Sequence, residues 1–203
     1  MLTIINYGVG NLFSIKNMFS KIGYQAIVTS DIKVIEQAEK IILPGVGNFD
    51  YCMESFRNTG FFDIVEKKVL GDKIPLLGIC AGFQMLFNKS EEGKEKGLGW
   101  IDDEIVRFKL PADSNLKIPH MGWTDINVKN DDILFKGIDE PRFYFVHSYH
   151  LPFSNHTYIT STANYGYEFA SSVRKENIFG VQFHPEKSHK YGMKIFENFS
   201  KIS

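Results

Sequence analysis

The sequence of 203 residues has little of what marks several classes of protein. Its two cysteines, Cys52 and Cys80, are too few for a disulfide framework, so we expect a reducing, cytoplasmic location. Basic and acidic residues nearly balance, with a formal net charge of −1, and no block of lysine or arginine occurs. This balance argues against nucleic acid as the main partner.

Long apolar runs are also missing. The N-terminal segment Met1–Asn6 has no basic region and no long apolar stretch, so the sequence predicts no signal peptide. The longest apolar runs have the length of strands, and we therefore expect no membrane partner. Apolar residues still make up 43% of the chain, which is enough for a full core. With no linker, repeat or low-complexity segment, we expect one domain over residues 1–203.

Short apolar runs alternate with helical periodicity in the first half of the chain. We expect strands at 2–5, 26–29, 40–43 and 75–79, and helices at 12–22, 31–38, 51–57, 62–70 and 81–87. Asn11 is placed to cap the first helix and Gly23 to end it. This alternation predicts an open, doubly wound, mostly parallel α/β sheet.

The pattern changes after residue 100. Short runs with turns between them predict strands at 104–108, 124–128, 142–146, 158–161 and 168–173. We expect these to add antiparallel strands to one edge of the sheet. A buried strand at 178–183 and a helix at 191–202 complete the predicted fold.

Cys80 ends an apolar strand and stands between Gly78 and Gly82. Ligands of open α/β sheets bind beyond the carboxyl ends of the strands. Small neighbours permit a sharp strand-to-helix turn that exposes a nucleophile, and the N-terminus of the next helix favours a thiolate. The Ala81 N–H is the natural oxyanion donor at this turn. The alternative is a buried structural cysteine, which is how we interpret Cys52.

A second apolar strand ends in Phe183-His-Pro-Glu186. The carboxylate of Glu186 can accept from one imidazole nitrogen of His184 and leave the other to face a thiol. A nucleophile, a base and an orienting group are the parts that covalent acyl transfer needs. The other histidines lack such a setting, and none has companions at ligand spacing, so we expect no metal site.

The run Pro44-Gly-Val-Gly47 follows the third predicted strand. Glycines allow peptide N–H groups to turn toward a ligand. A phosphate loop lacks its Gly-Lys-Ser/Thr signature here, and no dinucleotide pattern is present, so we predict no organic cofactor. An oxyanion-hole loop beside Cys80 is the better interpretation, with a plain glycine turn as the alternative.

Three of these motifs together resemble the class I (triad) glutamine amidotransferases, whose fold is flavodoxin-like: Gly78-Ile-Cys-Ala-Gly-Phe-Gln84, Pro44-Gly-Val-Gly47 and Val181-Gln-Phe-His-Pro-Glu186. Two further runs, Ile118-Pro-His-Met-Gly-Trp123 and Tyr144-Phe-Val-His-Ser-Tyr149, resemble the glutaminase subunits of imidazole glycerol phosphate synthases, which serve histidine biosynthesis. The resemblance extends from Asn6 to the last helix.

The resemblance implies that Cys80 attacks the side-chain amide of L-glutamine and that His184, oriented by Glu186, moves the protons. It further implies an oxyanion hole formed by Val46, Gly47 and Ala81. It also implies a substrate pocket formed by Gln84, His147, Ser148 and Tyr149. The implied partner is a (βα)8-barrel synthase subunit that receives the ammonia in a heterodimer. The implied contact and signalling residues are Asn11, His120, Met121 and Trp123, with core packing as the alternative for Trp123.

Two residues depart from the family pattern: Ala81, where a larger aliphatic residue is common, and Thr124, where we expect Asn. The run Gly97-Leu-Gly-Trp-Ile101 also resembles paralogues that supply ammonia for sugar amidination in surface polysaccharide biosynthesis. A cysteine peptidase on a related sheet and a catalytically silent subunit are further alternatives. The intact Cys80, His184 and Glu186 speak against a silent subunit.

Overall fold

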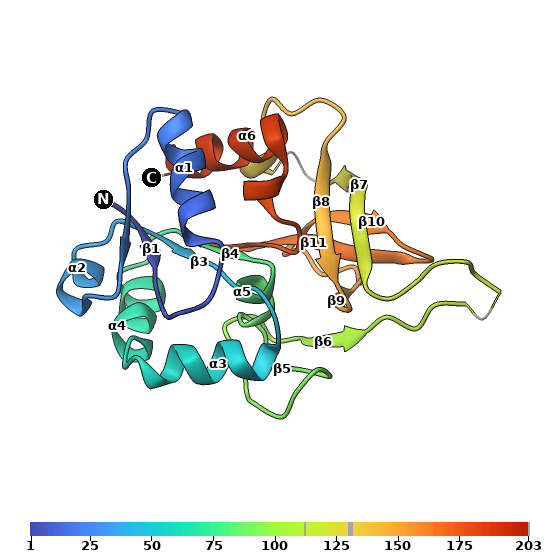
Figure 1. The fold of residues 1–203 in the computed structure, drawn as a ribbon, viewed down its shortest axis with the longest axis horizontal. Helices are drawn as coiled ribbons and strands as arrows, with labels where there is room; N and C mark the ends of the chain where they lie inside the picture. Colours follow the sequence, from blue (N-terminus) through green and yellow to red (C-terminus); the bar gives the residue numbers. More distant parts are fainter. Residues whose placement is uncertain (112, 130–131, 203) are drawn as a thin grey trace.

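The computed structural model describes residues 1–111, 113–129 and 132–202. Five strands form a parallel sheet in the order β2-β1-β3-β4-β12 (Figure 1). Their bounds are β1 Leu2–Ile5, β2 Ala26–Thr29, β3 Lys40–Leu43, β4 Leu76–Ile79 and β12 Ile178–Val181. The predicted parallel sheet is confirmed, and β1, β4 and β12 are buried along their whole length, as strands covered on both faces must be.

Antiparallel strands continue the sheet beyond β12, in the order β11-β10-β7-β8. Their bounds are β7 His120–Val128, β8 Arg142–His147, β10 Ile159–Asn164 and β11 Glu168–Lys175. Three shorter strands, β5 Lys89–Ser90, β6 Glu104–Arg107 and β9 Tyr149–Pro152, lie off this path. The antiparallel extension was predicted, but β5 and β9 were not. β7 begins four residues before the predicted strand because His120 pairs with His147 of β8.

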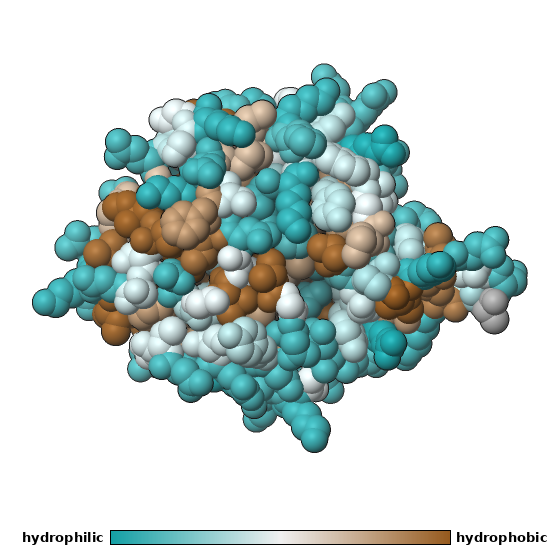
Figure 2. Space-filling view, in the orientation of Figure 1, coloured by the Kyte–Doolittle hydropathy of each residue, from teal (hydrophilic) through white to brown (hydrophobic). Residues whose placement is uncertain are grey.

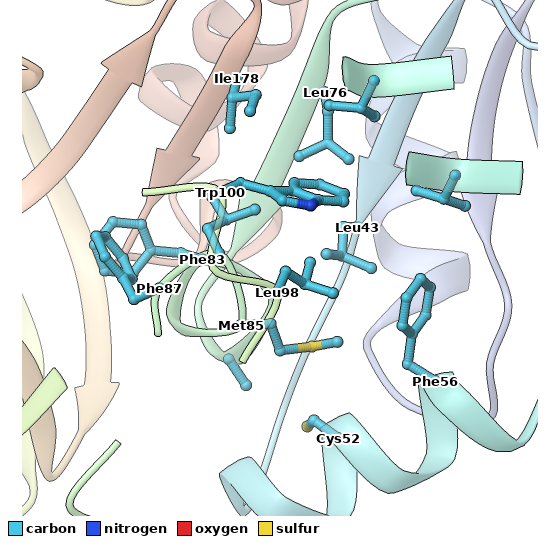
Figure 3. Packing of buried hydrophobic residues seen from close by; sticks show 14 of the residues in the cluster. Leu43, Cys52, Phe56, Leu76, Phe83, Met85, Phe87, Leu98, Trp100 and Ile178 are labelled. Atoms are coloured by element: carbon cyan, nitrogen blue, oxygen red, sulfur yellow. The ribbon is translucent and has the colours of Figure 1, made fainter. Parts of the chain in front are cut away.

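Helices cover both faces of the parallel sheet. The helices α1 Leu12–Lys21 and α6 His189–Ser200 pack together on one face, where Phe19 and Phe196 are in contact. The other face is covered by α3 Phe49–Asn58, α4 Phe62–Glu66 and α5 Ala81–Gln84. Figure 3 shows the core on this second face, where Phe56, Phe83 and Trp100 pack around Leu43 and Leu76. The remaining helical elements are α2 Ile32–Glu36, η1 Lys67–Gly71, η2 Ile133–Phe135 and η3 Pro185–Lys187.

The helix after Cys80 is shorter than predicted. We expected it to run to residue 87, but α5 ends at Gln84. The carbonyl groups of Met85, Leu86 and Phe87 instead accept hydrogen bonds from the backbone of residues 98–101. These apolar residues are therefore buried by a returning chain segment and do not extend the helix, which a local helical pattern cannot reveal.

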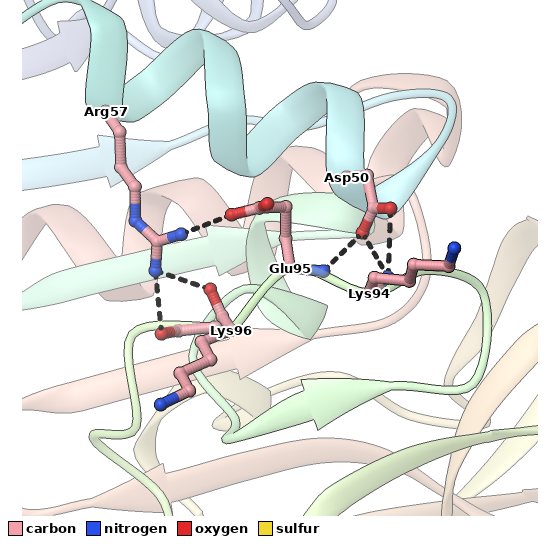
Figure 4. A network of polar contacts seen from close by, with 6 residues as sticks. Asp50, Arg57, Lys94, Glu95 and Lys96 are labelled. Atoms are coloured by element: carbon pink, nitrogen blue, oxygen red, sulfur yellow. Dashed lines mark hydrogen bonds and ion pairs between the residues drawn. The ribbon is translucent and has the colours of Figure 1, made fainter.

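A polar network ties α3 to the loop that follows β5 (Figure 4). The Asp50 carboxylate accepts from the backbone N–H groups of Lys94 and Glu95. Arg57 donates to the Glu95 carboxylate at 2.6 Å and to the Lys96 carbonyl oxygen at 2.6 Å. In the same loop, Glu92 accepts from the backbone N–H of Phe49, the first residue of α3, at 2.8 Å. The helix and the loop are thus held together at both ends.

Candidate active site

Cys80 occupies a strained turn between β4 and α5. Its φ is 54°, in the left-handed region that residues with a side chain rarely adopt. A Cβ atom on Gly78 would lie 2.7 Å from the carbonyl oxygen of Gly82, and one on Gly82 would lie 2.1 Å from that of Leu43. The two glycines are therefore required by close backbone contact, which allows the turn to present the thiol at the carboxyl end of the sheet.

His184 and Glu186 follow β12, the strand that pairs with β4. Nδ1 of His184 lies 2.8 Å from Oε1 of Glu186, and both side chains are almost fully buried. Because a carboxylate can only accept, Nδ1 carries the proton, and Nε2 is the ring nitrogen left for the thiol. The Cys80 sulfur is close enough to the His184 ring to act on its charge, and both residues line the same cavity. The structure thus brings the three predicted catalytic residues together in one row.

The electrostatics of this row favour a charged imidazole. Burial opposes the imidazolium form, but the Cys80 sulfur and the Glu186 carboxylate outweigh burial and raise the pKa of His184 to about 10. Burial likewise opposes ionisation of Glu186, yet hydrogen bonds from His184 and Asn11 hold the pKa of this carboxyl below its usual range. The arrangement therefore places an imidazolium between the sulfur and the carboxylate.

Asn11 has a different role from the one predicted. We expected it to cap α1, but its side chain makes no capping hydrogen bond. Its Nδ2 donates instead to Oε1 of Glu186 at 2.8 Å, across 175 positions of sequence. The prediction was wrong because capping considers only local partners: a cap needs Oδ1 to accept from a nearby backbone N–H, whereas the fold directs this side chain so that Nδ2 donates to a distant carboxylate.

The predicted oxyanion loop lies beside the thiol. Gly45 packs so closely on α5 that a Cβ would lie 2.2 Å from the backbone nitrogen of Gly82. Tyr7 donates its hydroxyl to the carbonyl oxygen of Pro44 at 2.5 Å, and the thiol of Cys52 donates to that of Val46 at 3.5 Å. Cys52 is itself fully buried, in agreement with its predicted packing role. The loop is therefore held at two of its carbonyl groups.

A cavity of about 490 Å³ opens over Cys80 and His184. Its walls include residues predicted for the oxyanion hole, the substrate pocket and the partner contact: Val46, Gly47, Ala81, Gln84, His147, Ser148, Tyr149 and Asn11. Glu92 and Lys187 also line it and were not predicted. The only sequence signal for Glu92 was its charge, within the short mixed-charge run of residues 91–96, which by itself predicts no site.

Gln182 was also missed. Its side chain is fully buried, with Nε2 3.8 Å from the Cys80 sulfur and Oε1 accepting from Gln84 at 3.0 Å. The available signal was an amide in the otherwise apolar run 178–183, since a buried polar group needs a partner.

The segment predicted for partner contact is divided between surface and interior. Met121 and Trp123 have exposed fractions of 61% and 38%, so Trp123 is not a core residue. Its ring stacks on that of His189, with centroids 5.5 Å apart. His120 lies on the opposite side of β7 and is buried, so it does not belong to the exposed surface of the chain, and its role toward a partner stays a prediction.

His120 instead joins a hydrogen-bonded chain inside the protein. Its Nδ1 lies 3.0 Å from Nε2 of His147, and its Nε2 lies 2.8 Å from the hydroxyl of Thr124. Nδ1 of His147 lies 2.7 Å from the carbonyl oxygen of Tyr149, which can only accept. Burial lowers the pKa of His120 to about 4 and that of His147 well below its usual range, so both rings are neutral at pH 7.

Comparison with known proteins agrees with this geometry. The sequence model of the family described as "Glutamine amidotransferase class-I" matches residues 3–202. The chain belongs to the class I glutamine amidotransferases. It is 53% identical to "Imidazole glycerol phosphate synthase subunit HisH 2" of Methanococcus maripaludis, with 99% of each chain covered. It is 46% identical to the subunit of the same name from Pseudomonas aeruginosa, with both chains covered completely.

Solved structures show the same fold at lower identity. A crystal structure titled "glutamine amidotransferase" matches with a TM-score of 0.75 and 19% identity, covering 98% of this amidotransferase and 97% of that chain. PurLQS from Thermotoga maritima matches with a TM-score of 0.72 and 18% identity, covering 98% and 96%. Within residues 1–111, 113–129 and 132–202 of this amidotransferase, no group of side chains has the composition of a metal site. None of the helices described there has the length and apolar character of a membrane span.

Proposed function

We propose that the chain is the glutaminase subunit of an imidazole glycerol phosphate synthase. The observation that carries the proposal is the identity of 53% to a subunit of that name over 99% of both chains. Three side chains suited to acyl transfer, lying at the carboxyl ends of adjacent strands, support the proposed chemistry. The reaction would hydrolyse L-glutamine to glutamate and ammonia, inside the reducing cytoplasm that two free thiols suit.

In the proposed first step the Cys80 sulfur attacks the amide carbon of glutamine. His184 gives a proton to the departing nitrogen, ammonia leaves, and a thioester remains. In the second step His184 takes a proton from water, the oxygen attacks the thioester, and the carbon–sulfur bond breaks to release glutamate. Glu186 keeps the imidazole oriented through both steps, and Asn11 holds Glu186 in place.

The cavity residues would bind and polarise the substrate. Backbone N–H groups of Val46, Gly47 and Ala81 are the proposed oxyanion donors, since all three residues line the cavity beside the sulfur. One such donor contributes roughly 3–4 kcal/mol to the transition state. The substrate pocket would be formed by Gln84 and by the segment of His147, Ser148 and Tyr149.

Glu92 extends this pocket with a carboxyl group. Its carboxylate lines the cavity and is fixed by the backbone N–H of Phe49. We assign it to the α-ammonium group of glutamine, because an ammonium group pairs with a carboxylate in a partly buried site.

The proposed partner is a (βα)8-barrel synthase subunit that takes ammonia directly. Exposed apolar side chains that follow the cavity residues Asn11 and Pro119 closely in sequence support such an interface: Phe13 on α1 with an exposed fraction of 74%, and Met121 and Trp123 on β7. Figure 2 shows apolar residues gathered in a band across this view of the molecule, between polar rims. Direct transfer would keep ammonia away from water, which protonates it at neutral pH.

The test is glutamine hydrolysis with and without a barrel subunit. Cys80→Ala should lower turnover by roughly four orders of magnitude or more, because the nucleophile is lost. Cys52→Ser is the matched control, since it keeps a donor for the Val46 carbonyl and should retain most of the turnover. Turnover that survives Cys80→Ala would rule out the proposed nucleophile. Failure to complement a histidine auxotroph that lacks the glutaminase subunit would reject the proposed pathway.

A further inference from the structure

Gln182 has an unusual position for an amide side chain. It is fully buried and stands two residues before His184, just after β12. Its two polar atoms face different partners: Oε1 lies 3.0 Å from Nε2 of Gln84, and Nε2 lies 3.8 Å from the Cys80 sulfur. One end of the amide thus touches the reacting atom of the proposed mechanism.

The orientation of the Gln182 amide is fixed by groups that cannot reverse their role. The carbonyl oxygen of Tyr149 can only accept, so the atom of Gln84 that lies 3.1 Å from it must be the donating Nε2. The same Nε2 faces Gln182, whose facing atom must then be the accepting Oε1. Only Nε2 of Gln182 is left to face Cys80. The sulfur is therefore met by an N–H donor, without reliance on an arbitrary choice of amide rotamer.

We propose that the side-chain amide of Gln182 donates a hydrogen bond to the Cys80 sulfur and stabilises the thiolate in both half-reactions. This inference rests on the proposed glutaminase function. In the first half-reaction the thiolate is the nucleophile, and in the second it is the leaving group as the carbon–sulfur bond breaks. The proton of His184 moves during both steps, whereas an amide N–H does not titrate and remains a donor throughout.

Apart from His184, whose proton moves during both steps, the surroundings of the sulfur give little stabilisation to an anion. The thiol is nearly buried, with Cys80 7% exposed, so water gives an anion little help. The carbonyl oxygen of Val146, 4.0 Å away, can only accept and does not favour negative charge. The helix that begins after the thiol has four residues, too few to develop a large dipole.

The experiment measures alkylation of Cys80 by iodoacetamide at pH 7 in the full-length chain without a partner, using peptide mass spectrometry to separate Cys80 from Cys52. Gln182→Met keeps the approximate volume and removes the donor. We expect alkylation about tenfold slower than in the wild type, because a hydrogen bond to a charged group is lost. Gln25→Met, the same change at an exposed glutamine, should leave the rate unchanged.

A second measurement applies even where Gln182→Met does not fold. The chain has four glutamines, so protein labelled with ¹⁵N in glutamine side chains gives four amide pairs. Replacing Cys80 by alanine should shift the Gln182 amide resonance, and should shift those of Gln25 and Gln37 much less. A Gln182→Met alkylation rate equal to the wild type, or a Gln182 resonance indifferent to Cys80→Ala, would overturn the proposal. Slower alkylation in a chain that does not hydrolyse glutamine would support the Gln182 contact and reject the glutaminase function.

Discussion

The buried His120 makes the stability of the fold depend on pH in a defined window. The ordinary pKa of histidine is 6.5, and burial lowers the pKa of His120 to about 4 in the folded chain. Between pH 6.5 and about 4, His120 therefore binds a proton in the unfolded chain but not in the folded chain. The stabilisation is fully present above pH 6.5, is lost as the pH falls, and reaches its minimum near pH 4.

The size of this effect follows from the shift of about 2.5 pH units. At 1.36 kcal/mol per unit, His120 alone changes the free energy of unfolding by about 3 kcal/mol across the window. Burial also lowers the pKa of His147 and of His150, so both contribute in the same direction. A loss of this order is a large part of the stability of a typical domain.

The assay is urea unfolding of the free chain at several pH values from 4 to 7.5. His120→Gln removes the titration but keeps a donor for His147 and an acceptor for Thr124, whose hydrogen bonds hold the ring. The slope of the unfolding free energy against pH should be smaller in this variant than in the wild type. The difference in slope corresponds to at most one proton bound on unfolding. Parallel curves for the two proteins would refute the view that burial lowers the pKa of His120 in the folded chain.

Three further predictions concern the triad, the turn and the core. Asn11→Ala should lower glutamine hydrolysis by about tenfold with little change in melting temperature, because Glu186 loses a charge-assisted hydrogen bond; an unchanged kcat would contradict a positioning role. Gly82→Ala should destabilise the fold by about 1–3 kcal/mol or more in thermal unfolding, because the new Cβ would lie 2.1 Å from a backbone oxygen. Gly71→Ala is the control that we expect to be tolerated, because its Cβ would meet only a side-chain atom at 3.9 Å. Phe183→Ala should lower the free energy of unfolding in urea by about 3–5 kcal/mol, because this buried ring stacks on that of Phe143. Phe13→Ala, at an exposed position, should change it by no more than about 0.5 kcal/mol. Equal losses of unfolding free energy in the two variants would show that burial does not decide the effect.

Local signals were sufficient for the parallel half of the fold. Runs such as 41–43 and 76–79 are apolar on both faces, and only a sheet covered by helices buries such runs. The shorter α5 and the added strand β9 could not be predicted in this way. Both depend on hydrogen bonds with segments distant in sequence, residues 98–101 for the first and strands β6 and β11 for the second. The extent of the domain, residues 1–203, stays a prediction.

For the site, spacing and residue type pointed to Cys80, His184 and Glu186, because each lies at the end of an apolar strand. The hydrogen bonds of Asn11 and His120 were missed for a common reason. Their hydrogen-bond partners are 175 and 27 residues away, and only the paired strands and the packing of α1 bring them near. Sequence patterns identify which side chains can do chemistry, but they do not identify the buried groups that orient those side chains.

The polar ties between α3 and the loop after β5 have a consequence for substrate recognition. The loop of residues 44–47 leads into α3, and the first residue of α3 donates a hydrogen bond to Glu92 in the loop after β5. Asp50 and Arg57 of α3 bind other residues of this same loop after β5. A shift of α3 along its axis would therefore displace both walls of the cavity at once. The proposed contact of Glu92 with the substrate ammonium group and the position of the proposed oxyanion donors Val46 and Gly47 would then change together. Substrate affinity and turnover would therefore change together as well.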